Sequence, residues 1–337
     1  MTKTLKELSK EIGYSLGTVS RAINDKKSVS ESTKKKILEE LEKRGYQPNR
    51  IAQSLVNQQS HLIGVILPDI SNGFFSSITR YLEHALESAG YHMLLFNTDW
   101  NTDSEKDKIL LAQANQVDGI ILKPVSTTKR FKRLLSVPTV LISQEYDDSI
   151  SWIDIDNFGT GYQAAQHLIA CGYKKMAFVS CYPDNNISYV KRRNGFLNAL
   201  QENNISIPSE YITSCMPGIS EGYKKMAELF ALPDPPDSVF CLDDFNAFGF
   251  LSYANEHGIN IPEDFGIIGC NDTEFAKMSQ INLTTISHSL PQMAASAVST
   301  IINMIEQKDN WNNQRIVLTP SFIYRSTTKV PKHIKNL

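Results

Sequence analysis

Short apolar runs alternate with longer amphipathic stretches along most of the chain, from residue 62 onward. The first runs are LIGVIL at 62–67, YHMLLF at 91–96, GIIL at 119–122 and TVLI at 139–142. Helical patterns such as FFSSITRYLEHALESAG separate them. Runs of this length are typical of buried strands, and their alternation with helices predicts a parallel sheet built from β-α-β units.

A second series of the same kind follows in the C-terminal half. Its apolar runs are MAFVS at 176–180, SVFCL at 238–242 and FGIIG at 265–269, and its helical stretches lie around 157–171, 187–204 and 244–257. This predicts a second parallel sheet, with helices covering both faces of each sheet. Ligands of such folds bind at the carboxyl ends of the strands, so two sheets that face each other should enclose a cleft there.

Polar and aromatic side chains stand close to the ends of the predicted strands. They are Asp69, Ser71, Phe74 and Phe75 after the first strand, Arg192 before Gly195-Phe196, Asp243 and Asp244 after SVFCL, and Asn271 and Asp272 after FGIIGC. Arg, Asp and Asn groups bind sugar hydroxyls, and an aromatic ring stacks on the C–H face of a sugar, so this set suits a sugar. The alternative is that the Asp side chains cap the following helices and the Phe side chains pack the lobe.

The first 60 residues have a different pattern, with three short helical stretches. Thr4, Ser15 and Ser30 precede these stretches as N-caps, and Gly13 and Gly45 end the first and the third. The apolar positions expected to face inward are Leu5, Leu8, Ile12, Val19, Ile23, Ile37, Leu38 and Leu41. Two helices joined by a tight turn that contains glycine form a helix-turn-helix, whose second helix can enter the major groove of DNA.

The outward polar residues of the second helix, Thr18, Ser20 and Arg21, are the candidates for contacting bases. Residues 1–60 contain twelve Lys and Arg against seven Asp and Glu, whereas the rest of the chain has an acidic surplus of seven. A basic segment favours a polyanion partner, although it can also be a solvated surface. Without further signals, the second helix could equally be a packing helix of an ordinary small bundle.

The motifs SLGTVSRAIN at 15–24 and GYQPNRIAQSL at 45–55 resemble the LacI/GalR family of transcription regulators, and the resemblance covers nearly the whole chain. It implies that Leu16, Gly17 and Arg21 read bases in the major groove. It also implies a hinge helix in the minor groove, containing Asn49, Ala52 and Leu55. The expected DNA contacts are completed by Thr4, Ser15, Thr18, Ser20, Asn24, Tyr46, Arg50 and Gln53.

The implied DNA contacts make physical sense. Arg21 can pair bidentately with guanine, and Leu55 can wedge between base steps and kink the duplex. Two positions depart from the common family pattern: Gly17 offers no side chain, and Gln53 replaces a frequent Arg. The base preference at Gly17 therefore stays open, and Gln53 could give up one phosphate contact.

The resemblance also implies two lobes like those of periplasmic binding proteins, with the chain crossing between them near 160, 290 and 320. We therefore expect an N-terminal all-α helix-turn-helix domain over 1–46 and a hinge helix and linker over 47–60. An α/β core with parallel sheets should follow over 61–337 and bind the effector and a second subunit. Lobe one should comprise about 61–160 and 290–320, and lobe two about 161–289 and 321–337.

The effector predicted by this arrangement is a sugar or a phosphorylated sugar. Many sugar-responsive relatives carry an acid at the positions matching Ser143 and Asn271 and an aromatic residue near Pro217, and here all three differ. Neutral groups beside Arg192 should tolerate an anionic ligand, whereas the carboxylate of Asp243 favours a neutral one. Both possibilities remain open.

Several other classes find little support in the sequence. No apolar run approaches the length of about 18 residues that spans a bilayer, and the N-terminus is polar, so we expect a cytoplasmic protein. The five cysteines are odd in number and widely spaced, which favours reduced core residues over disulfides. The histidines never show HExxH spacing and no Walker A motif occurs, so we expect no metal and no cofactor.

The strongest enzyme-like motif is the Gly-x-Ser-x-Gly pattern at 218–222. Pro217 stands where a strand should lead into the turn, and neither an HGGG-like loop nor a suitably placed His accompanies it. We therefore expect Ser220 to cap a helix and the chain to have no catalytic residues.

Together these patterns predict a dimeric repressor-like regulator that binds palindromic operator DNA and a small-molecule effector. The alternative is a ligand-binding protein or a sugar-acting enzyme on the same two-lobed core. The operator, the regulated genes, the direction of the effector's influence and a possible corepressor protein stay open.

Overall fold

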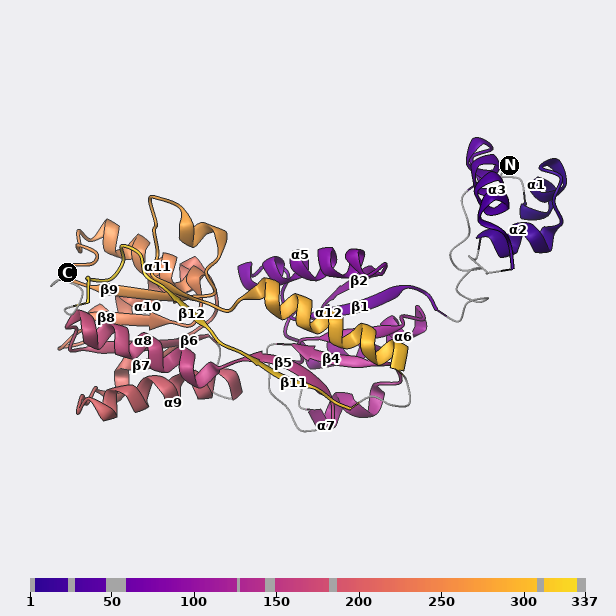
Figure 1. The fold of residues 1–337 in the computed structure, drawn as a ribbon. Coiled ribbons are helices and arrows are strands. Elements are labelled where there is room, and N and C mark those ends of the chain that lie inside the picture. Colours follow the sequence, from indigo (N-terminus) through magenta and orange to yellow (C-terminus); the bar gives the residue numbers. More distant parts are fainter. Residues whose placement is uncertain are drawn as a thin grey trace. The chain divides into compact units, whose positions relative to one another are not determined.

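The computed structural model describes residues 4–23, 28–46, 59–125, 128–142, 149–181, 187–307 and 312–331. The chain forms two compact units, which are described separately (Figure 1). The smaller unit holds residues 1–62 and 116–118, and the larger holds residues 63–115 and 119–337.

The smaller unit contains the helices α1 (Leu5–Glu11), α2 (Leu16–Ile23) and α3 (Glu31–Lys43). Their buried apolar side chains pack into one core that consists of Leu8, Val19, Ala22, Ile37 and Leu41. The prediction that Leu38 faces inward is wrong, because its side chain is 38% exposed. Leu38 lies about 100° around the helix from Ile37, and Leu41 completes the inward face of α3 instead.

The turn between α1 and α2 forms as its residue types predict. Thr4 and Glu7 make a capping box, in which the Glu7 N–H donates to Thr4 Oγ1 (3.4 Å) and the Thr4 N–H donates to Glu7 Oε2 (2.8 Å). Gly13 follows α1 with φ of +79°, a conformation that favours glycine. Ser15 Oγ then accepts from the Thr18 N–H at 3.1 Å and caps α2. The predicted helix-turn-helix is therefore present.

The larger unit contains two six-stranded sheets. The first has the order β11-β5-β4-β3-β1-β2 and consists of β1 (Leu62–Leu67), β2 (His92–Asn97), β3 (Gly119–Leu122), β4 (Thr139–Ile142), β5 (Ser151–Ile155) and β11 (Arg315–Leu318). The second has the order β12-β10-β9-β8-β6-β7 and consists of β6 (Met176–Cys181), β7 (Ile212–Cys215), β8 (Ser238–Cys241), β9 (Gly266–Cys270), β10 (Thr285–Ser287) and β12 (Ser321–Ile323). The described pairings are parallel except β10–β12, which is antiparallel. The predicted α/β fold with two lobes is confirmed.

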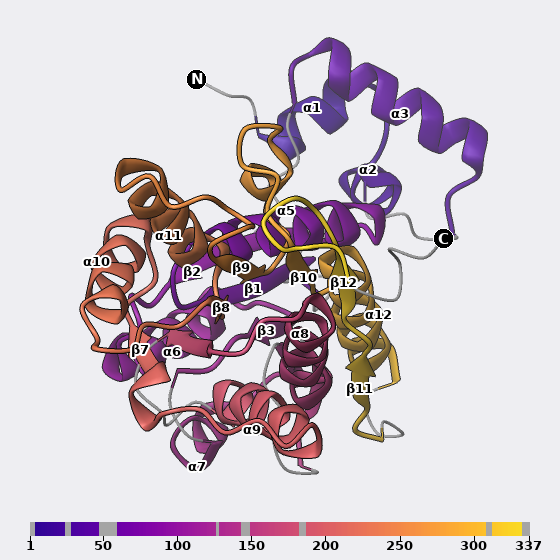
Figure 2. The same cartoon turned by 90° about the vertical axis from the view of Figure 1, so that its left-hand side faces the viewer.

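Helices cover the sheets in layers (Figures 1 and 2). On the first sheet, α5 (Gly73–Ser88) and α12 (Leu290–Gln307) share one apolar core with β1, β3, β4 and β5, while α6 (Thr102–Ala114) contacts β2 and α7 (Thr128–Phe131) precedes β4. On the second sheet, α8 (Asn157–Cys171) and α9 (Ile187–Glu202) share one core, and α10 (Ile219–Phe230) and α11 (Asp244–Glu256) share another. Alternating residues of β6 enter these two cores, so the helix pairs lie on opposite faces.

The chain passes between the sheets after β5, after β10 and after β11. The apolar-run pattern does not predict these three strands, nor α6 and α12. β10 has only three residues, β5 is interrupted by Asp154, and β11 begins with Arg315 and has only three apolar residues, so none of them has an apolar run as long as those of the predicted strands.

Helix α10 begins at Ile219, and its N-cap residue is Gly218, with φ of +135°. The prediction that Ser220 caps this helix is wrong, because Ser220 is exposed and lies inside the first turn. A backbone with this φ suits glycine and would be strained for serine. The N-cap is therefore Gly218, two residues before the predicted Ser220.

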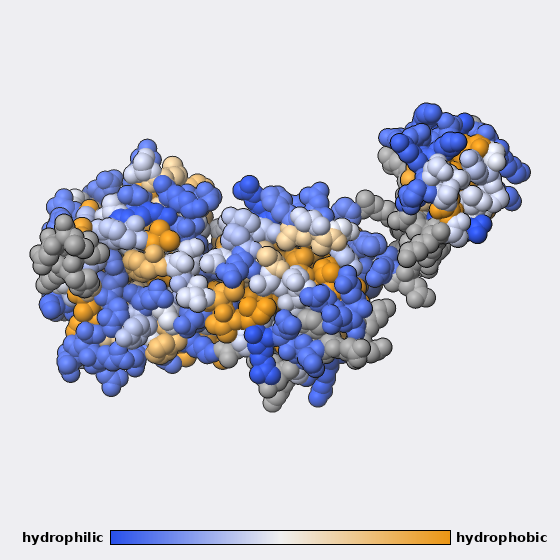
Figure 3. All heavy atoms as spheres, viewed as in Figure 1, coloured by the Kyte–Doolittle hydropathy of each residue, from blue (hydrophilic) through white to orange (hydrophobic). Residues whose placement is uncertain are grey.

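The visible face of the larger unit is largely hydrophilic, with separate apolar patches (Figure 3). Exposed apolar side chains of this unit include Leu110, Leu111, Phe275, Met278 and Val317. The five cysteines are all free, and Cys215 alone of them is half-buried rather than buried. Within the described ranges, we find no helix long and apolar enough to cross a membrane.

Helices α8 and α9 approach each other closely through two glycines. A Cβ at Gly161 would lie 1.8 Å from the backbone oxygen of Arg192, and a Cβ at Gly195 would lie 2.0 Å from that of Phe158. Because both obstructing atoms belong to the backbone, a side chain at either glycine would have to displace a helix. This packing fixes the position of Arg192 on α9.

We expect Gly161→Ala to lower the free energy of unfolding by about 1–3 kcal/mol, the usual cost of overpacking. This cost must exceed the gain of about 1 kcal/mol from the better helix propensity of alanine. Urea unfolding followed by circular dichroism measures the change. Gln201→Ala, on the exposed side of α9, is the control and should shift stability by less than about 0.5 kcal/mol. Equal unfolding midpoints for the two variants would show that the close crossing contributes nothing.

Candidate functional site

The outward side of α2 carries several residues expected to contact DNA. Its exposed residues are Ser15, Leu16, Gly17 and Arg21, and Thr18 and Ser20 are half-buried beside them. Val19 and Ala22 face the opposite way, into the helical core. The helix therefore presents a continuous mixed surface, with Leu16 43% exposed at its N-terminal end.

The Arg21 side chain extends back along α2. Its Nε donates to the backbone oxygen of Gly17 at 3.0 Å, and a Cβ at position 17 would lie 3.8 Å from Arg21 Nη2. This bond engages Nε, whereas bidentate pairing with guanine can use the terminal Nη groups. A Cβ at position 17 would therefore only be in ordinary van der Waals contact with the guanidinium, so this placement of Arg21 does not require glycine there.

Two other expected DNA contacts have structural roles in the smaller unit. Thr4 caps α1, and Tyr46 packs against the helical core, where burial raises the pKa of its phenol. The remaining expected contacts, Asn24, Asn49, Arg50, Ala52, Gln53 and Leu55, lie outside the described residues, as does the effector candidate Ser143.

A pocket lies where the carboxyl ends of strands from both sheets meet. It is lined by Asn72, Phe74, Phe75, Trp100, Lys123, Cys181, Ser188, Tyr189, Arg192, Pro217, Leu242, Asp243 and Asn271. Asn72, Trp100 and Lys123 follow strands of the first sheet, whereas Asp243 and Asn271 follow strands of the second. Both lobes therefore contribute to one pocket, at the parallel strand ends where the fold class predicts it.

The pocket brings together five of the expected effector-binding residues, Phe74, Phe75, Arg192, Asp243 and Asn271. Asp69 and Ser71 are not among its lining residues. Asp69 Oδ1 accepts from the Ser71 N–H (2.9 Å) and the Ser71 hydroxyl (2.6 Å) in a local turn instead. Their sequence position after a strand predicted that Asp69 and Ser71 line the pocket, but in the structure their side chains are engaged in the turn.

Sequence reasoning missed Asn72, Trp100, Lys123, Ser188 and Tyr189. For Lys123 a signal was present, because it follows GIIL directly, as Asp243 follows its own strand. Asn72 also has a recognisable role as the N-cap of α5, where its Oδ1 accepts from the Phe74 N–H at 2.9 Å.

Arg192 is buried at the lobe-two side of the pocket, with 5% of its surface exposed. Its Nε donates to Asn157 Oδ1 at 2.9 Å, and its Nη1 lies 3.7 Å from Cys270 Sγ. The guanidinium also lies 5.7 Å from the centre of the Tyr189 ring, within cation–π range. These contacts hold the guanidinium in place and leave N–H groups for a ligand.

Asp243 both caps a helix and lines the pocket. Its Oδ1 accepts from the Phe245 N–H at 2.8 Å and caps α11, while its Oδ2 accepts from Asn72 Nδ2 (3.1 Å) and Asn271 Nδ2 (3.4 Å). Burial raises the pKa of this carboxyl group, and the hydrogen bond from Asn72 opposes the increase. The Asn72–Asp243 bond joins lobe one to lobe two directly at the pocket.

Aromatic rings form the lobe-one wall. Phe74 and Phe75 pack edge to face at 5.0 Å, and Phe75 packs against Trp100 at 5.9 Å between ring centres. Both Phe side chains also enter the core under α5. They can therefore support the lobe and present a face to a sugar ring at the same time.

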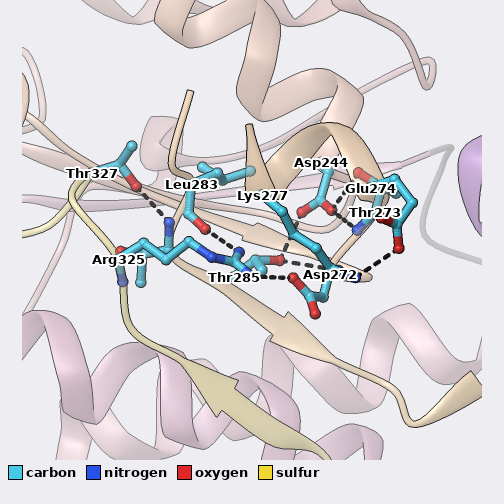
Figure 4. Close-up of polar contacts among 10 residues, drawn as sticks. Asp244, Asp272, Thr273, Glu274, Lys277, Leu283, Thr285, Arg325 and Thr327 are labelled. Carbon is cyan, nitrogen blue, oxygen red and sulfur yellow. Dashed lines mark hydrogen bonds and ion pairs between the residues drawn. The ribbon is translucent and has the colours of Figure 1, made fainter. Parts of the chain in front are cut away.

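The acidic residues next to these lining groups have structural roles (Figure 4). Asp244 is fully buried, and its Oδ2 accepts from the N–H (2.8 Å) and hydroxyl (3.0 Å) of Thr273, while Oδ1 accepts from the Thr285 hydroxyl (2.7 Å). Asp272 forms an ion pair of 2.6 Å with Arg325, which follows β12. The two residues tie β9, β10 and the C-terminal segment to α11 beneath the pocket.

Ser220 of the Gly-x-Ser-x-Gly pattern lies on the surface of α10. Within the described ranges, no cluster of three or more His, Cys, Asp or Glu side chains could hold a metal ion.

Comparisons with known proteins agree with this architecture. Residues 4–49 match the bacterial regulatory proteins of the lacI family, and residues 165–328 match the periplasmic binding protein-like domain. The chain is 30% identical over 332 residues to the HTH-type transcriptional regulator RegA of Clostridium saccharobutylicum, which covers 97% of this chain and 100% of RegA.

Solved structures show the same fold. The lac repressor dimer bound to operator and the anti-inducer ONPF aligns with a TM-score of 0.85 at 22% identity, covering 98% of this chain and 100% of that chain. A LacI family transcriptional regulator from Enterococcus faecium with bound ribose aligns with a TM-score of 0.71 at 27% identity, covering 80% of this chain and 99% of that chain.

Asp244 should make the stability of the larger unit depend on pH. Burial raises its pKa from 3.8 to about 7, so the folded chain keeps a proton that the unfolded chain releases. Stability is therefore fully present at low pH and falls as pH rises through this window. Asp244→Asn has no proton to lose, and its melting temperature should change less between about pH 5 and pH 8 in scanning calorimetry.

The matched control is Asp107→Asn, which changes an exposed residue of α6. Its melting temperature should depend on pH as that of the native chain does. Parallel curves for the native chain and Asp244→Asn would contradict the role assigned to Asp244.

Proposed function

The chain belongs to the lacI family of bacterial regulatory proteins and is a DNA-binding transcription regulator, and from this premise we propose that it is a homodimeric repressor controlled by a small sugar-like effector. The observation that carries the effector half of this proposal is the pocket formed jointly by both lobes. The regulated genes are proposed to be those of sugar uptake or catabolism. Such a regulator acts on chromosomal DNA, so we place it in the cytoplasm.

We propose that α2 enters the major groove of the operator. Its exposed face, with Leu16, Gly17 and Arg21, is supported from behind by the core around Val19. Arg21 pairs with a guanine, and Leu16 makes apolar contact with a base edge. The basic surplus of residues 1–60 supports phosphate contacts, which supply affinity without sequence preference.

The proposed division of the chain follows from the same reasoning. Residues 1–46 read the major groove, residues 47–60 form the hinge and linker, and residues 61–337 bind the effector and the second subunit. Matches at 4–49 and 165–328 support this division. A two-fold symmetric dimer would read two half-sites of a palindromic operator, with one α2 in each.

The effector is proposed to bind across the pocket. Asp243, Asn271 and Asn72 supply acceptors and donors for hydroxyl groups, and Phe75 with Trp100 supplies an apolar face. The relative with bound ribose supports a sugar. Because the pocket includes groups from both lobes, a ligand that contacts both favours one arrangement of the lobes, which is what an allosteric effector requires.

Arg21→Ala tests the DNA half of the proposal. Loss of one bidentate pair should remove about 1–3 kcal/mol of discrimination in each half-site, so the affinity ratio between operator and random DNA should collapse. An operator selected from a pool of palindromic duplexes, followed by fluorescence anisotropy at fixed salt, measures this ratio. Lys10→Ala, on the exposed side of α1, is the charge-matched control. It should weaken binding to both DNAs about equally.

If Arg21→Ala kept the native ratio, α2 would not be the reading helix. Effector binding to the larger unit should be unchanged in both variants, which separates the DNA half of the proposal from the effector half.

A further inference from the structure

The pocket residue Arg192 is linked to two of the segments on which the chain passes between the lobes. Its Nε donates to Asn157 Oδ1 at 2.9 Å, and its Nη1 lies 3.7 Å from Cys270 Sγ. Asn157 is the first residue of α8, directly after the crossing from β5. The Cys270 sulfur lies 3.2 Å from Nε2 of His288, which stands at the crossing from β10 to α12.

The amide group of Asn157 is held in one direction by lobe one. Its Nδ2 donates to Asp154 Oδ2 (3.1 Å) and to the backbone oxygen of Ile155 (3.1 Å), and both acceptors belong to β5. Because these acceptors fix the NH₂ end of the amide, Oδ1 faces Arg192. Asn157 is buried and is not among the residues that line the pocket, so an effector can influence it through Arg192.

The second link leads from Arg192 to the segment between β10 and α12. His288 is fully buried, and burial lowers the pKa of its ring well below the usual range, so the ring is neutral. Its Nδ1 has no hydrogen-bond partner among the described residues, which leaves Cys270 as the polar neighbour of the ring within that part of the chain. The next residue, Ser289, has φ of +49°, a conformation that is unusual for serine, so its surroundings specify the bend of this crossing.

Arg192 is therefore placed where it can influence both crossings. The guanidinium is planar and rigid, so a ligand that reorients its Nη groups also changes the bond at Nε and the contact with the sulfur. Asp154, which accepts from Asn157, also stabilises the positive charge of Arg192, so the cluster needs no ligand to balance its buried charge. The cluster can exist in the empty pocket and respond when the pocket is filled.

We propose that Asn157 and Cys270 are positioning residues of the effector site, which act through Arg192 and couple occupancy of the pocket to two segments that connect the lobes. This rests on the proposed function, because it concerns the effector site of the same regulator. Asn157 sets the plane of the guanidinium from the crossing after β5, and Cys270 connects the guanidinium to His288 at the crossing after β10. Loss of either contact should also loosen the crossing at the other end, which a purely local role would not do.

Hydrogen exchange of the full chain without effector tests this coupling, because exchange rates report local opening. Asn157→Ala should speed exchange in segment 285–290 about fivefold or more, and Cys270→Ala should do the same in segment 152–157. The matched controls are Asn194→Ala, at an exposed position of α9, and Cys241→Ala, at a buried position of β8. Both controls should leave the two segments at the native rate.

A double-mutant cycle tests whether Arg192 is the link. In the Arg192→Ala background both contacts are already absent, so Asn157→Ala should no longer change exchange in segment 285–290. Native exchange at the far segment in both Asn157→Ala and Cys270→Ala would overturn the proposal, and so would a far effect that persists without Arg192. If one of these variants fails to fold, the other provides the same test from the opposite end.

A sugar probe separates positioning from stability. D-ribose and D-glucose are titrated into the full chain by calorimetry, and operator affinity is measured by fluorescence anisotropy with and without the sugar that binds. Asn157→Ala should weaken binding of that sugar about tenfold, and Cys270→Ala should reduce the change that the bound sugar causes in operator affinity. An unchanged sugar affinity in the first variant together with an unchanged operator response in the second would overturn the proposal.

Failure of the proposed function would give a different result. If the native chain bound neither sugar, the sugar effector would be in doubt, and if it bound no operator, the DNA-binding role would be in doubt. Exchange in segments 152–157 and 285–290 would still support or overturn the coupling, because that measurement needs neither ligand nor DNA.

Discussion

The structure of the larger unit depends on how it accommodates buried charge where its two lobes meet. Arg192 Nε donates to Asn157 Oδ1, Asn157 Nδ2 donates to Asp154 Oδ2, and Asp154 in turn stabilises the charge of Lys123. This chain of contacts runs from α9 through the first residue of α8 to β5 and β3. A buried charge without such partners would cost several kcal/mol, so each of these residues constrains the others. The position of Arg192 is further fixed by the close crossing of α8 and α9 at Gly161 and Gly195.

Much of the fold follows from apolar periodicity alone, because buried parallel strands must be apolar on both faces. β1 and β3 are apolar along their whole length, β4 is apolar after Thr139, and all three coincide with the predicted runs. The pattern fails where a strand is polar or brief. β5 carries the buried Asp154, and this carboxylate is tolerated because Asn157, the Ile155 N–H and Lys123 are nearby. Ile155 and Asn157 are close in sequence, but Lys123 comes from a different strand end, so a local pattern cannot show that partner.

The sequence predicted where the pocket lies better than it predicted which residues line it. The rule that ligands bind after parallel strands selects Asp243, Asn271 and Phe75, which line the pocket, and it would have selected Lys123, another lining residue, if applied to β3. It also selects Asp69 and Asp244, which the structure directs into a local turn and into a buried network of Thr273 and Thr285. Which way a side chain points depends on turn geometry and on three-dimensional neighbours. Of the adjacent residues Asp243 and Asp244, the first therefore lines the pocket and the second lies in the buried network.

That division gives the pocket a mechanical consequence. Asp244 connects α11 rigidly to β9 and β10 through Thr273 and Thr285, so Asp243 moves with lobe two as one body. Asn72 is equally fixed to lobe one as the cap of α5. The bond between Asn72 and Asp243 is thus a contact between two rigid bodies rather than between two mobile side chains. A ligand that competes with the Asn72–Asp243 bond, or that strengthens it, therefore changes the relative free energies of the possible lobe arrangements. Rotation of one side chain cannot compensate for this change, because packed cores do not deform continuously.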